Sequence, residues 1–526
     1  MREELSRTRV DGFLDVRGKD IVNGKGQKIL LSGWGLGNWL LCEGYMWQSH
    51  DMKEFDRPWK IEKIIRELTG DAYAADFWKK YRDTYVTEVD LQYMAELGYN
   101  SVRIPVSWKV LMEEGTDELC FKEEGFQLLD RVIDWCEKYK LYAILDLHAA
   151  PGGQTGANID DSRDDIPELF TEQRFFDMGI ALWKKIAKRY KDRWIVGGYD
   201  LLNEPIRPQR NANDSNVDYL VPKLQKFYEC AIAAIRSVDR KHLVTLEGQH
   251  WAAETDIFDQ RYDDRMVIDF HRYGCFPQKE SFAKYITAAQ RLDCPLWMGE
   301  TGEGSLEWYT AMYTLSARLG IGYNLWTWKK MDGFNSPCSI RVPENWQLIL
   351  NYAKGGKKPD RQKAQQILDQ FLENIRIQNC DLHEEVTHAV FRQAGCSIRG
   401  MDYDWCAQDN KPEPCCYYPD RKQGYGFDSG WEKMALRLFK GSIVEYEVNR
   451  IFQGDSMSLK ITAEEDTELE ILQDGRKIGF CSLHAFARED EGAMGSWEFH
   501  ESKTSLIWIR VLSGQAVLDS VETFCG

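Results

Sequence analysis

The chain has 526 residues, which is long for a single ordinary domain, and hydrophobic residues make up 43% of it, enough for a sizeable core. Its net charge of −17 excludes a nucleic-acid partner, because binding to phosphates requires clustered lysine and arginine. No stretch approaches the roughly 18 consecutive apolar residues of a membrane span, so we expect no membrane partner.

The cysteines and the first residues indicate a compartment. The 14 cysteines are scattered without a C-x-x-C pair, and Met1–Glu4 leads into a charged segment rather than the apolar core of an export signal. We therefore expect reduced thiols and a cytoplasmic protein. Cys415 and Cys416 are adjacent, but no partner spacing supports a metal site, and we expect no metal and no cofactor.

Short apolar runs alternate with helical patterns along the first 375 or so residues. Strands are predicted at 29–34, 100–105, 142–148, 199–204, 242–247, 266–271, 295–300 and 322–328. Helices are predicted at 86–97, 126–136, 176–190, 220–238, 282–292, 306–319 and 361–375. About eight strands that alternate with helices predict an α/β fold of the (β/α)8 TIM-barrel type.

A doubly wound open sheet is the structural alternative. It would require a glycine-rich phosphate-binding turn after the first strand. The stretch Gly33–Gly37 is rich in glycine, but it lacks the downstream helix and acidic residue at the required spacing. The barrel is therefore the better interpretation.

Three local features of the barrel region carry further expectations. A long insertion at about 43–85 contains Trp47, Trp59 and Trp78 and follows the first strand. In the helix that follows this insertion, the spacing predicts four inward-facing side chains, which are Val86, Val89, Met94 and Leu97. Pro105 is expected to end the second strand.

The pattern changes after about residue 379. Shorter, alternating strands are predicted at 442–448, 458–462, 469–473 and 506–511, and Asp474-Gly475 is a hairpin turn signal. This predicts an all-β sandwich of the jelly-roll-like kind. The expected domains are 1–378 and 379–526.

Two glutamates stand at the ends of predicted barrel strands. Glu204 follows Asn203 and precedes Pro205, and Glu300 ends another apolar run. Strand ends at the C-terminal face of a barrel carry active sites, and two carboxylates suit the hydrolysis of glycosidic bonds. The alternative for each glutamate is a strand end that faces water.

Further unusual polar or aromatic side chains lie at the same predicted strand ends, namely Arg103, His148, His271, Tyr273 and Trp326. Each has an ordinary structural alternative: a salt-bridge partner, a satisfied core histidine or a core tryptophan. Their coincidence at one barrel face is hard to explain by structure alone, so we interpret them as substrate-binding residues.

Taken together, these motifs resemble glycoside hydrolase family 5, the cellulase-like family, over residues 20–375. The resemblance rests on Asn203-Glu204-Pro205, Glu300, 98–105, 146–148, 271–273 and 325–328. It implies a retaining β-glycosidase in which Glu204 is the acid/base and Glu300 the nucleophile.

The resemblance also implies roles for neighbouring residues. Asn203 would bind the sugar 2-hydroxyl, and Tyr273 would hold the nucleophile ionised and oriented. Arg103 would favour its carboxylate form by charge, and Trp326 would form the floor under the reacting sugar.

Three stretches look most like the exo-β-1,3-glucanase and β-glucosidase branch of the family. They are 36–43, 77–90 and 148–154, and in that branch the glutamate matching Glu43 grips the terminal sugar. The insertion, Ala149 and the extra C-terminal part depart from that branch. The alternatives are an endo-acting β-glucanase or cellulase, a β-mannosidase, or a non-catalytic carbohydrate-binding protein. The expected partner is a carbohydrate substrate.

The C-terminal part resembles a carbohydrate-binding module of the family 6 type through 400–404, 424–428 and 441–448. Candidate sugar-stacking aromatics are Trp405, Tyr417, Tyr418, Tyr425 and Trp497. The alternative, which we favour slightly, is that these side chains form sandwich core and that the domain only packs on the barrel.

Overall fold

The protein is described from a computed structural model, which places residues 9–50, 52–115, 119–209, 216–422, 429–485 and 494–526. The chain divides into two compact units, each of which is described by itself. The first comprises Met1–Arg272, Phe282–Thr301 and Gly320–Leu382, and the second Tyr273–Ser281, Gly302–Leu319 and His383–Gly526.

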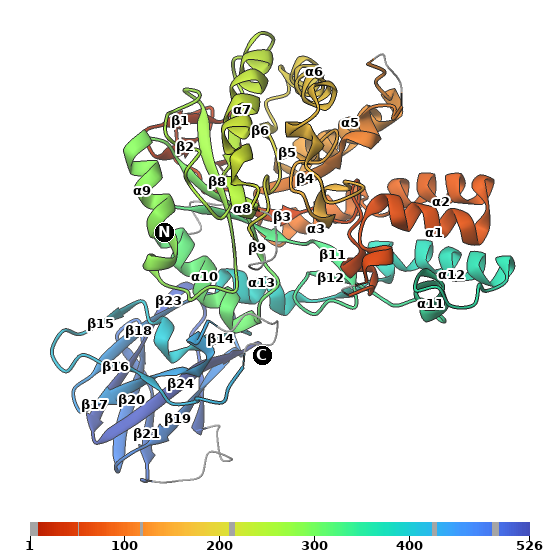
Figure 1. Ribbon diagram of the computed structural model, residues 1–526. Helices are drawn as coiled ribbons and strands as arrows, with labels where there is room; N and C mark the ends of the chain where they lie inside the picture. The colour runs from red at the N-terminus through yellow and green to blue at the C-terminus, as the bar shows by residue number, and fades with distance from the viewer. Residues whose placement is uncertain (1–8, 51, 116–118, 210–215, 423–428, 486–493) are drawn as a thin grey trace. The chain divides into compact units, whose positions relative to one another are not determined.

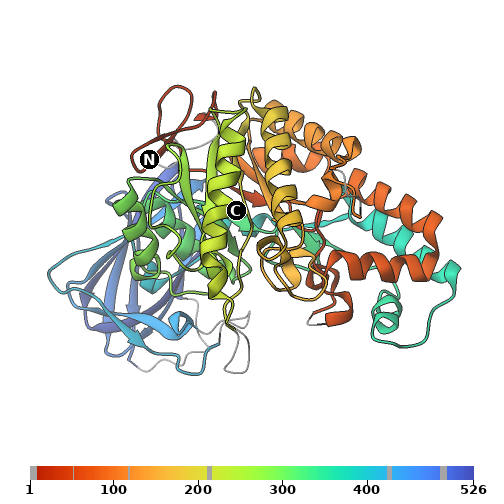
Figure 2. The same ribbon diagram turned by 45° about the horizontal axis from the view of Figure 1, so that its top comes forward.

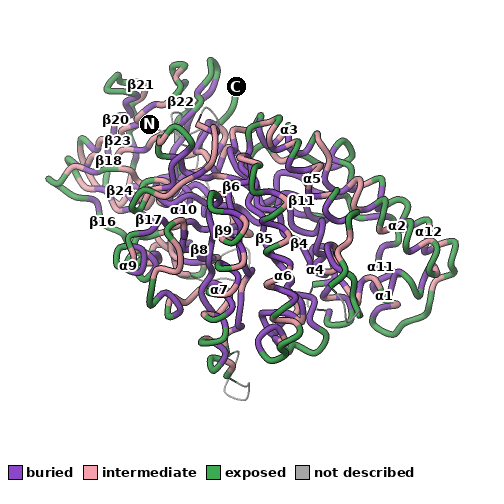
Figure 3. Tube along the Cα trace, turned by 90° about the horizontal axis from the view of Figure 1, so that it is seen from above, coloured by how far each residue is buried: buried purple, intermediate pink, exposed green. Residues whose placement is uncertain are grey.

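A closed barrel of parallel strands forms the centre of the first unit (Figure 1), in the order β10-β3-β4-β5-β6-β7-β8-β9. The strands are β3 (Ser32–Gly35), β4 (Ser101–Ser107), β5 (Tyr142–Ala149), β6 (Val196–Asp200), β7 (Leu243–Glu247), β8 (Met266–Tyr273), β9 (Leu296–Gly302) and β10 (Gly322–Trp326). The predicted TIM barrel is confirmed. The barrel strands labelled in Figure 3, β4, β5, β6, β8 and β9, are mostly coloured as buried, as expected where helices cover a parallel sheet.

Helices connect most of the strands. They are α3 (Glu88–Glu96), α5 (Glu123–Tyr139), α6 (Gln173–Tyr190), α7 (Val221–Arg236), α9 (Ala283–Leu292), α10 (Leu306–Arg318) and α12 (Arg361–Asn374). Between β7 and β8 the chain instead has the single turn α8 (Gln249–Ala252), with left-handed backbone at His250 and Trp251. This explains why the sequence shows no helical pattern there.

Most strands end within a few residues of the prediction, and the ends of β4 and β6 bear on the site. β4 continues through Pro105, although proline has no N–H to donate. The hydrogen bonds to the preceding segment are made on either side of this residue: the Arg103 carbonyl accepts from the Leu36 N–H, and the Ser107 N–H donates to the Leu40 carbonyl. β6 ends at Asp200, before Glu204 rather than at it.

Helix α3 begins after a capping box formed by Thr87 and Asp90. Met94 and Val86 are buried as predicted, but Val89 is 42% exposed and Leu97 is only partly buried. The inward face of the helix instead contains Leu91, because the capping box starts the helix at Glu88 and turns Val89 outward.

The insertion folds into two helices, α1 (Pro58–Thr69) and α2 (Asp71–Thr84), which pack against α12. Figure 2 shows α1, α2, α11 (Gln347–Ala353) and α12 grouped beside the barrel. Trp47 is fully buried at the base of this group, and its ring lies 4.7–6.2 Å from those of Phe55, Trp78, Tyr81, Trp346 and Phe371.

The second unit contains two antiparallel sheets that pack as a sandwich, as predicted. One has the order β16-β17-β24-β19-β22, with β14 also paired to β24, and the other β15-β18-β23-β20-β21. Their strands are β14 (Ser397–Arg399), β15 (Trp405–Cys406), β16 (Glu413–Cys416), β17 (Met434–Phe439), β18 (Ile443–Ile451), β19 (Ser456–Ala463), β20 (Thr467–Gln473), β21 (Arg476–Leu483), β22 (Met494–Glu498), β23 (Ser502–Ser513) and β24 (Gln515–Phe524).

The aromatic candidates of the sandwich separate into different environments. Trp497 is buried in the core, whereas Trp405 is 50% exposed on β15. Tyr417 and Tyr418 are half-buried and contact each other edge to face, with the Arg421 guanidinium over the second ring. Tyr425 and the stretch 424–428 lie outside the described residues.

All fourteen cysteines lie in the described part of the chain, and none of them forms a disulfide. Eight are buried, which agrees with the reduced core thiols expected from the sequence. Across the described residues, no helix is both long and apolar enough to cross a membrane.

Candidate active site

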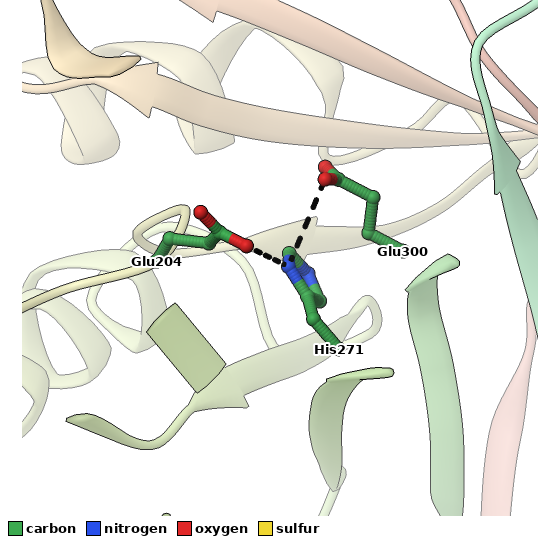
Figure 4. A group of neighbouring side chains, drawn as sticks. All are labelled: Glu204, His271 and Glu300. Atoms are coloured by element: carbon green, nitrogen blue, oxygen red, sulfur yellow. Dashed lines mark hydrogen bonds and ion pairs between the residues drawn. The ribbon is translucent and has the colours of Figure 1, made fainter. Parts of the chain in front are cut away.

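Three side chains meet at the carboxyl end of the barrel strands (Figure 4). Glu204 follows β6, His271 lies near the end of β8, and Glu300 lies near the end of β9. The His271 Nδ1–H donates to Glu204 Oε1 at 2.8 Å and lies 3.9 Å from Glu300 Oε1. Carboxylate oxygens of Glu204 and Glu300 lie within 4.8 Å of each other.

The backbone of Glu204 has an unusual conformation. Its φ of 45° lies in the left-handed region, which costs a non-glycine residue on the order of 1–3 kcal/mol. The Glu204 N–H donates to Glu247 Oε2 at 2.6 Å. Glu247, at the buried end of β7, thus holds the turn that carries Glu204. The side chain of Glu204 is 14% exposed.

Arg103 is the fully buried centre of the ion-pair network. Its guanidinium donates to Glu300 Oε2 at 2.7 Å, to Asp200 Oδ2 at 2.9 Å and to Glu247 Oε1 at 3.1 Å. Asp146 Oδ2 lies 3.2 Å away. A buried guanidinium with this many carboxylates remains protonated, so it places a permanent positive charge beside Glu300.

Asn203 is oriented by two neighbours. Its Oδ1 accepts from Arg103 at 2.8 Å, and its carbonyl accepts from the Gln154 side chain at 2.7 Å. Because Oδ1 is occupied, the Nδ2 of Asn203 is the group left to donate to a ligand. This is the polarity needed to bind a sugar hydroxyl oxygen.

His271 lies between carboxylates. Burial lowers its pKa, but Glu247, Glu300 and Glu204 outweigh that effect and raise the pKa well above its usual value. Its Nε2 lies 3.3 Å from Glu247 Oε1. The carboxylates therefore favour a positively charged ring next to both Glu204 and Glu300.

The pKa of Glu204 is raised mainly by burial. The hydrogen bond and the charge of His271 oppose that rise, whereas the charges of Glu300 and Glu247 add to it. Desolvation makes a larger contribution to this rise than the charge of Glu300 does. Glu204 thus keeps its proton to a higher pH than an exposed glutamate does.

Trp326 and His148 form a flat wall of the site. Their rings are parallel, with centroids 5.2 Å apart. Burial and the charge of Arg103 lower the pKa of His148 to about 4, so the ring is neutral, and its Nδ1–H donates to Asp146 Oδ2 at 2.7 Å. The peptide bond after Trp326 is cis.

The glycine-rich stretch after β3 makes room for Trp326. A Cβ on Gly35 would lie 2.7 Å from Trp326 Cε3, and one on Gly37 would lie 2.7 Å from Cη2 and 2.6 Å from Thr327 Oγ1. These glycines therefore serve close packing under an aromatic ring rather than phosphate binding.

Glu43 and Tyr273 complete the predicted set. Glu43 is buried immediately before the turn η3 (Gly44–Trp47), and Tyr45 in that turn accepts a hydrogen bond of 2.8 Å from Trp326 Nε1. The segment that begins at Glu43 is therefore next to the wall of the site. Tyr273 is half-buried at the end of β8, and its action on Glu300 stays a prediction.

Buried acids that were not predicted as site residues surround this centre, namely Asp146, Asp200, Glu247 and Asp269. Burial raises the pKa of all three aspartates. Each has one buried carboxyl oxygen without a hydrogen-bond partner among the described residues. A signal was present in the sequence, because each acid interrupts or ends an apolar strand.

The same groups also have the composition of a metal site. Glu204, His271 and Glu300 have potential ligand atoms within 4.8 Å of one another, as do Glu247, Asp269 and His271. His271 belongs to both groups, and the carboxylates around it raise its pKa, which favours the protonated ring over the neutral form that a metal ion would need.

Paired carboxylates at the C-terminal face of a (β/α)8 barrel define a class, that of barrel glycosidases. The chain matches the model of the cellulase family, glycosyl hydrolase family 5, over residues 67–332. The chain therefore belongs to glycosyl hydrolase family 5.

The chain is similar to relatives that are named for different activities. It is 30% identical over 283 residues to a β-xylosidase from Phanerodontia chrysosporium, covering 53% of this chain and 56% of that protein. It is 25% identical to endoglucanase C from Acetivibrio thermocellus, covering 52% and 92%. It is 24% identical to a glucan 1,3-β-glucosidase from Lachancea kluyveri, covering 65% and 79%. The match thus spans little more than half the length of the first of these relatives.

Proposed function

We propose that the protein is a retaining β-glycosidase, with Glu204 as acid/base and Glu300 as nucleophile. The observation that carries this proposal is the distance below 4.8 Å between oxygens of the two carboxyl groups. Retaining enzymes place these groups about 5–5.5 Å apart, whereas inverting enzymes need about 6.5–9.5 Å to admit water. Membership of family 5 supports the same mechanism.

In the first step, the Glu300 carboxylate attacks the anomeric carbon while Glu204 gives its proton to the leaving oxygen. The carbon–oxygen bond to the aglycone breaks, and a glycosyl ester forms on Glu300. Arg103 keeps Glu300 ionised for the attack. The raised pKa of Glu204 keeps the required proton in place.

In the second step, Glu204 acts as a base. It takes a proton from a water molecule as the water oxygen attacks the anomeric carbon, and the ester bond to Glu300 breaks. The ester carries no charge, so Glu204 loses a neighbouring negative charge and its pKa falls. The sugar leaves with its original configuration, and both carboxyl groups return to their starting states.

We further propose exo action on small β-glucosides or β-linked oligosaccharides. The buried Glu43 beside the Trp326 wall supports a site closed around a terminal sugar. The tryptophans of the insertion give exo action less support, because Trp47 is packed inside an aromatic cluster. An endo-acting β-glucanase is the second candidate, favoured by the relationship to endoglucanase C.

Two assays test these proposals. A panel of aryl β-glycosides identifies the sugar. If the protein hydrolyses no member of the panel and no β-linked oligosaccharide, the glycosidase proposal is refuted. Product analysis over time on a β-linked oligosaccharide then separates the two modes. Release of single sugars or one fixed short unit from the start supports exo action, whereas a spread of intermediate lengths indicates an endo-acting enzyme.

The sandwich and the location are separate proposals. Trp405, on β15, is the most exposed of the four described candidate aromatics of the sandwich. Affinity electrophoresis in soluble glucans tests this: retardation that disappears in Trp405→Ala supports sugar binding, and equal mobility of both proteins rejects it. A cytoplasmic location, proposed from the free cysteines, is tested by cell fractionation.

A further inference from the structure

Glu247 contacts each of the groups on which the acid/base glutamate depends. It lies at the end of β7 and is fully buried. Its Oε2 accepts from the Glu204 backbone N–H at 2.6 Å. Its Oε1 lies 3.1 Å from Arg103 Nη2 and 3.3 Å from His271 Nε2. None of the motifs quoted for the family contains this residue.

We propose that Glu247 is a positioning residue for catalysis: its carboxylate fixes the backbone of Glu204 and the ring of His271 in one arrangement. The proposal rests on the acid/base role proposed for Glu204. Without an acceptor for its N–H, the left-handed turn at Glu204 would lose the contact that offsets its strain. A second contact on His271 fixes the ring that donates to the Glu204 carboxylate.

The order of the strands explains why one carboxylate can hold both the Glu204 backbone and the His271 ring. β7 lies between β6, which leads to Glu204, and β8, which carries His271. A long acidic side chain at the end of the middle strand therefore reaches both neighbours. Burial makes its charge effective, because a buried charge interacts more strongly than one in water.

A change at Glu247 must be considered against the other charges of the site. Glu204 and His271 are faced by Asp146 and His148 on β5, Asp200 on β6, Asp269 on β8, Glu300 on β9 and Arg103 on β4. Glu300 and Glu204 remain beside His271 when the charge of Glu247 is removed, so we expect the ring to keep its proton. Loss of one negative charge then lowers the pKa of Glu204, since Glu247 contributes to its rise.

Glu247→Gln tests the proposal, because it keeps the shape of the side chain and removes the charge. We expect the alkaline limb of the kcat/KM profile to move to lower pH by about one unit. We also expect kcat/KM to fall about tenfold to a hundredfold for glycosides with poor leaving groups, and less for activated aryl glycosides. A change in stability alone would produce neither effect.

A matched control lies just before the same strand. Asp239 is a buried carboxylate that contacts His242 Nδ1 at 2.5 Å and Tyr199 OH at 2.7 Å, at the opposite end of the barrel. Asp239→Asn also breaks a buried acid–histidine pair. We expect it to lower the melting temperature while the pH profile and the leaving-group dependence stay as in the wild type.

A double variant separates action through Glu204 from other effects. In Glu204→Ala, adding Glu247→Gln should cause much less further loss of kcat/KM than it causes in the wild type. If Glu247→Gln does not fold, Glu247→Asp replaces it. That variant keeps the charge but shortens the reach, so the alkaline limb should stay while kcat/KM falls.

The proposal is overturned if Glu247→Gln retains the wild-type alkaline limb and loses the same fraction of activity on all leaving groups. It is also overturned if its loss is fully additive with that of Glu204→Ala. Failure of the proposed function gives a different result: Glu204→Ala itself would then retain wild-type turnover.

Discussion

At the scale of single residues, the chemistry depends on the difference between two similar side chains. Glu300 faces the permanent charge of Arg103 at 2.7 Å, which favours its carboxylate form. The carboxyl group of Glu204 accepts a hydrogen bond from His271, while burial raises its pKa. One glutamate is thus kept ready to attack and the other to donate a proton.

Glu204→Gln tests the acid role. Because the amide cannot give a proton, we expect kcat/KM for glycosides with poor leaving groups to fall by about a hundredfold or more. Activated aryl glycosides need little proton transfer in the first step, so their loss there should be smaller. Steady-state kinetics on a series of leaving groups measures this, and equal losses on all members would contradict the assignment.

The pH profile of the wild type follows from the same pKa. The acid form of Glu204 is needed, and its pKa is raised, so activity should persist above the usual titration range of glutamate. Activity is then lost as the pH rises through the pKa of Glu204 in the folded enzyme. A kcat/KM profile whose alkaline limb lies at the pKa of an exposed glutamate, about 4.3, would contradict this expectation.

The sequence could place most of these residues at strand ends but could not assign their contacts. Glu204 and Glu300 stand out because apolar runs end at or just before them. Glu247 ends a similar run, yet its contacts with Arg103 and His271 arise only when three strands close side by side. The cause of the raised pKa of Glu204 was also beyond the sequence, because burial depends on the folded site.

At the scale of elements, close packing of β3 under β10 fixes the wall of the site. Gly37→Ala would place a Cβ 2.7 Å from Trp326 Cη2, so the ring must move. We expect kcat/KM to fall at least about tenfold, since small displacements of positioning groups are costly. Gly197→Ala on β6 is the control: its Cβ meets the flexible end of Ile144 at 2.9 Å, and activity should be retained.

Wild-type kcat/KM in Gly37→Ala, measured on the best substrate of the glycoside panel, would show that Trp326 does not need this position. A variant that loses activity only through unfolding is recognised by its circular dichroism spectrum. The kcat/KM of Gly197→Ala shows how much activity changes when a methyl group is added to a barrel glycine away from Trp326.

The insertion shows that aromatic residues near an active site can be structural. Trp47 is fully buried among aromatic rings of the insertion and of α12. Trp47→Ala should therefore lower the free energy of unfolding by about 3–5 kcal/mol, as large-to-small changes in a core do. Urea unfolding followed by circular dichroism measures this. Trp405→Ala, at an exposed site, should change it by less than about 0.5 kcal/mol.

The elements of the barrel could be predicted because periodicity changes between strand and helix along the chain. Details that depend on contacts between elements could not be predicted. Pro105 lies within β4 because the preceding strand has diverged there, and Val89 is exposed because the capping box at Thr87 sets the start of α3. The helices of the insertion were not predicted, although Ile61, Ile64, Ile65 and Leu68 are buried on one face of α1.

At the scale of the whole molecule, the barrel brings together residues that are far apart in sequence. Arg103 and Glu300 are separated by 197 positions and lie 2.7 Å apart. This convergence at one end of parallel strands is the reason why strand-end residues in the sequence were informative. The sandwich follows a different rule, an alternation of buried and exposed positions, and its Asp474-Gly475 turn has the positive φ angles that such hairpins require.

The central claim is that Glu300 forms a covalent bond with the sugar. A 2-deoxy-2-fluoro glycoside with a good leaving group, made from the sugar that the enzyme prefers, slows the breakdown of this intermediate. We predict that mass spectrometry of the intact protein will show the addition of one fluoroglycosyl group, and that the peptide containing Glu300 will carry it. A label on another residue, or an active enzyme that forms no adduct and releases product of inverted configuration, would contradict the account.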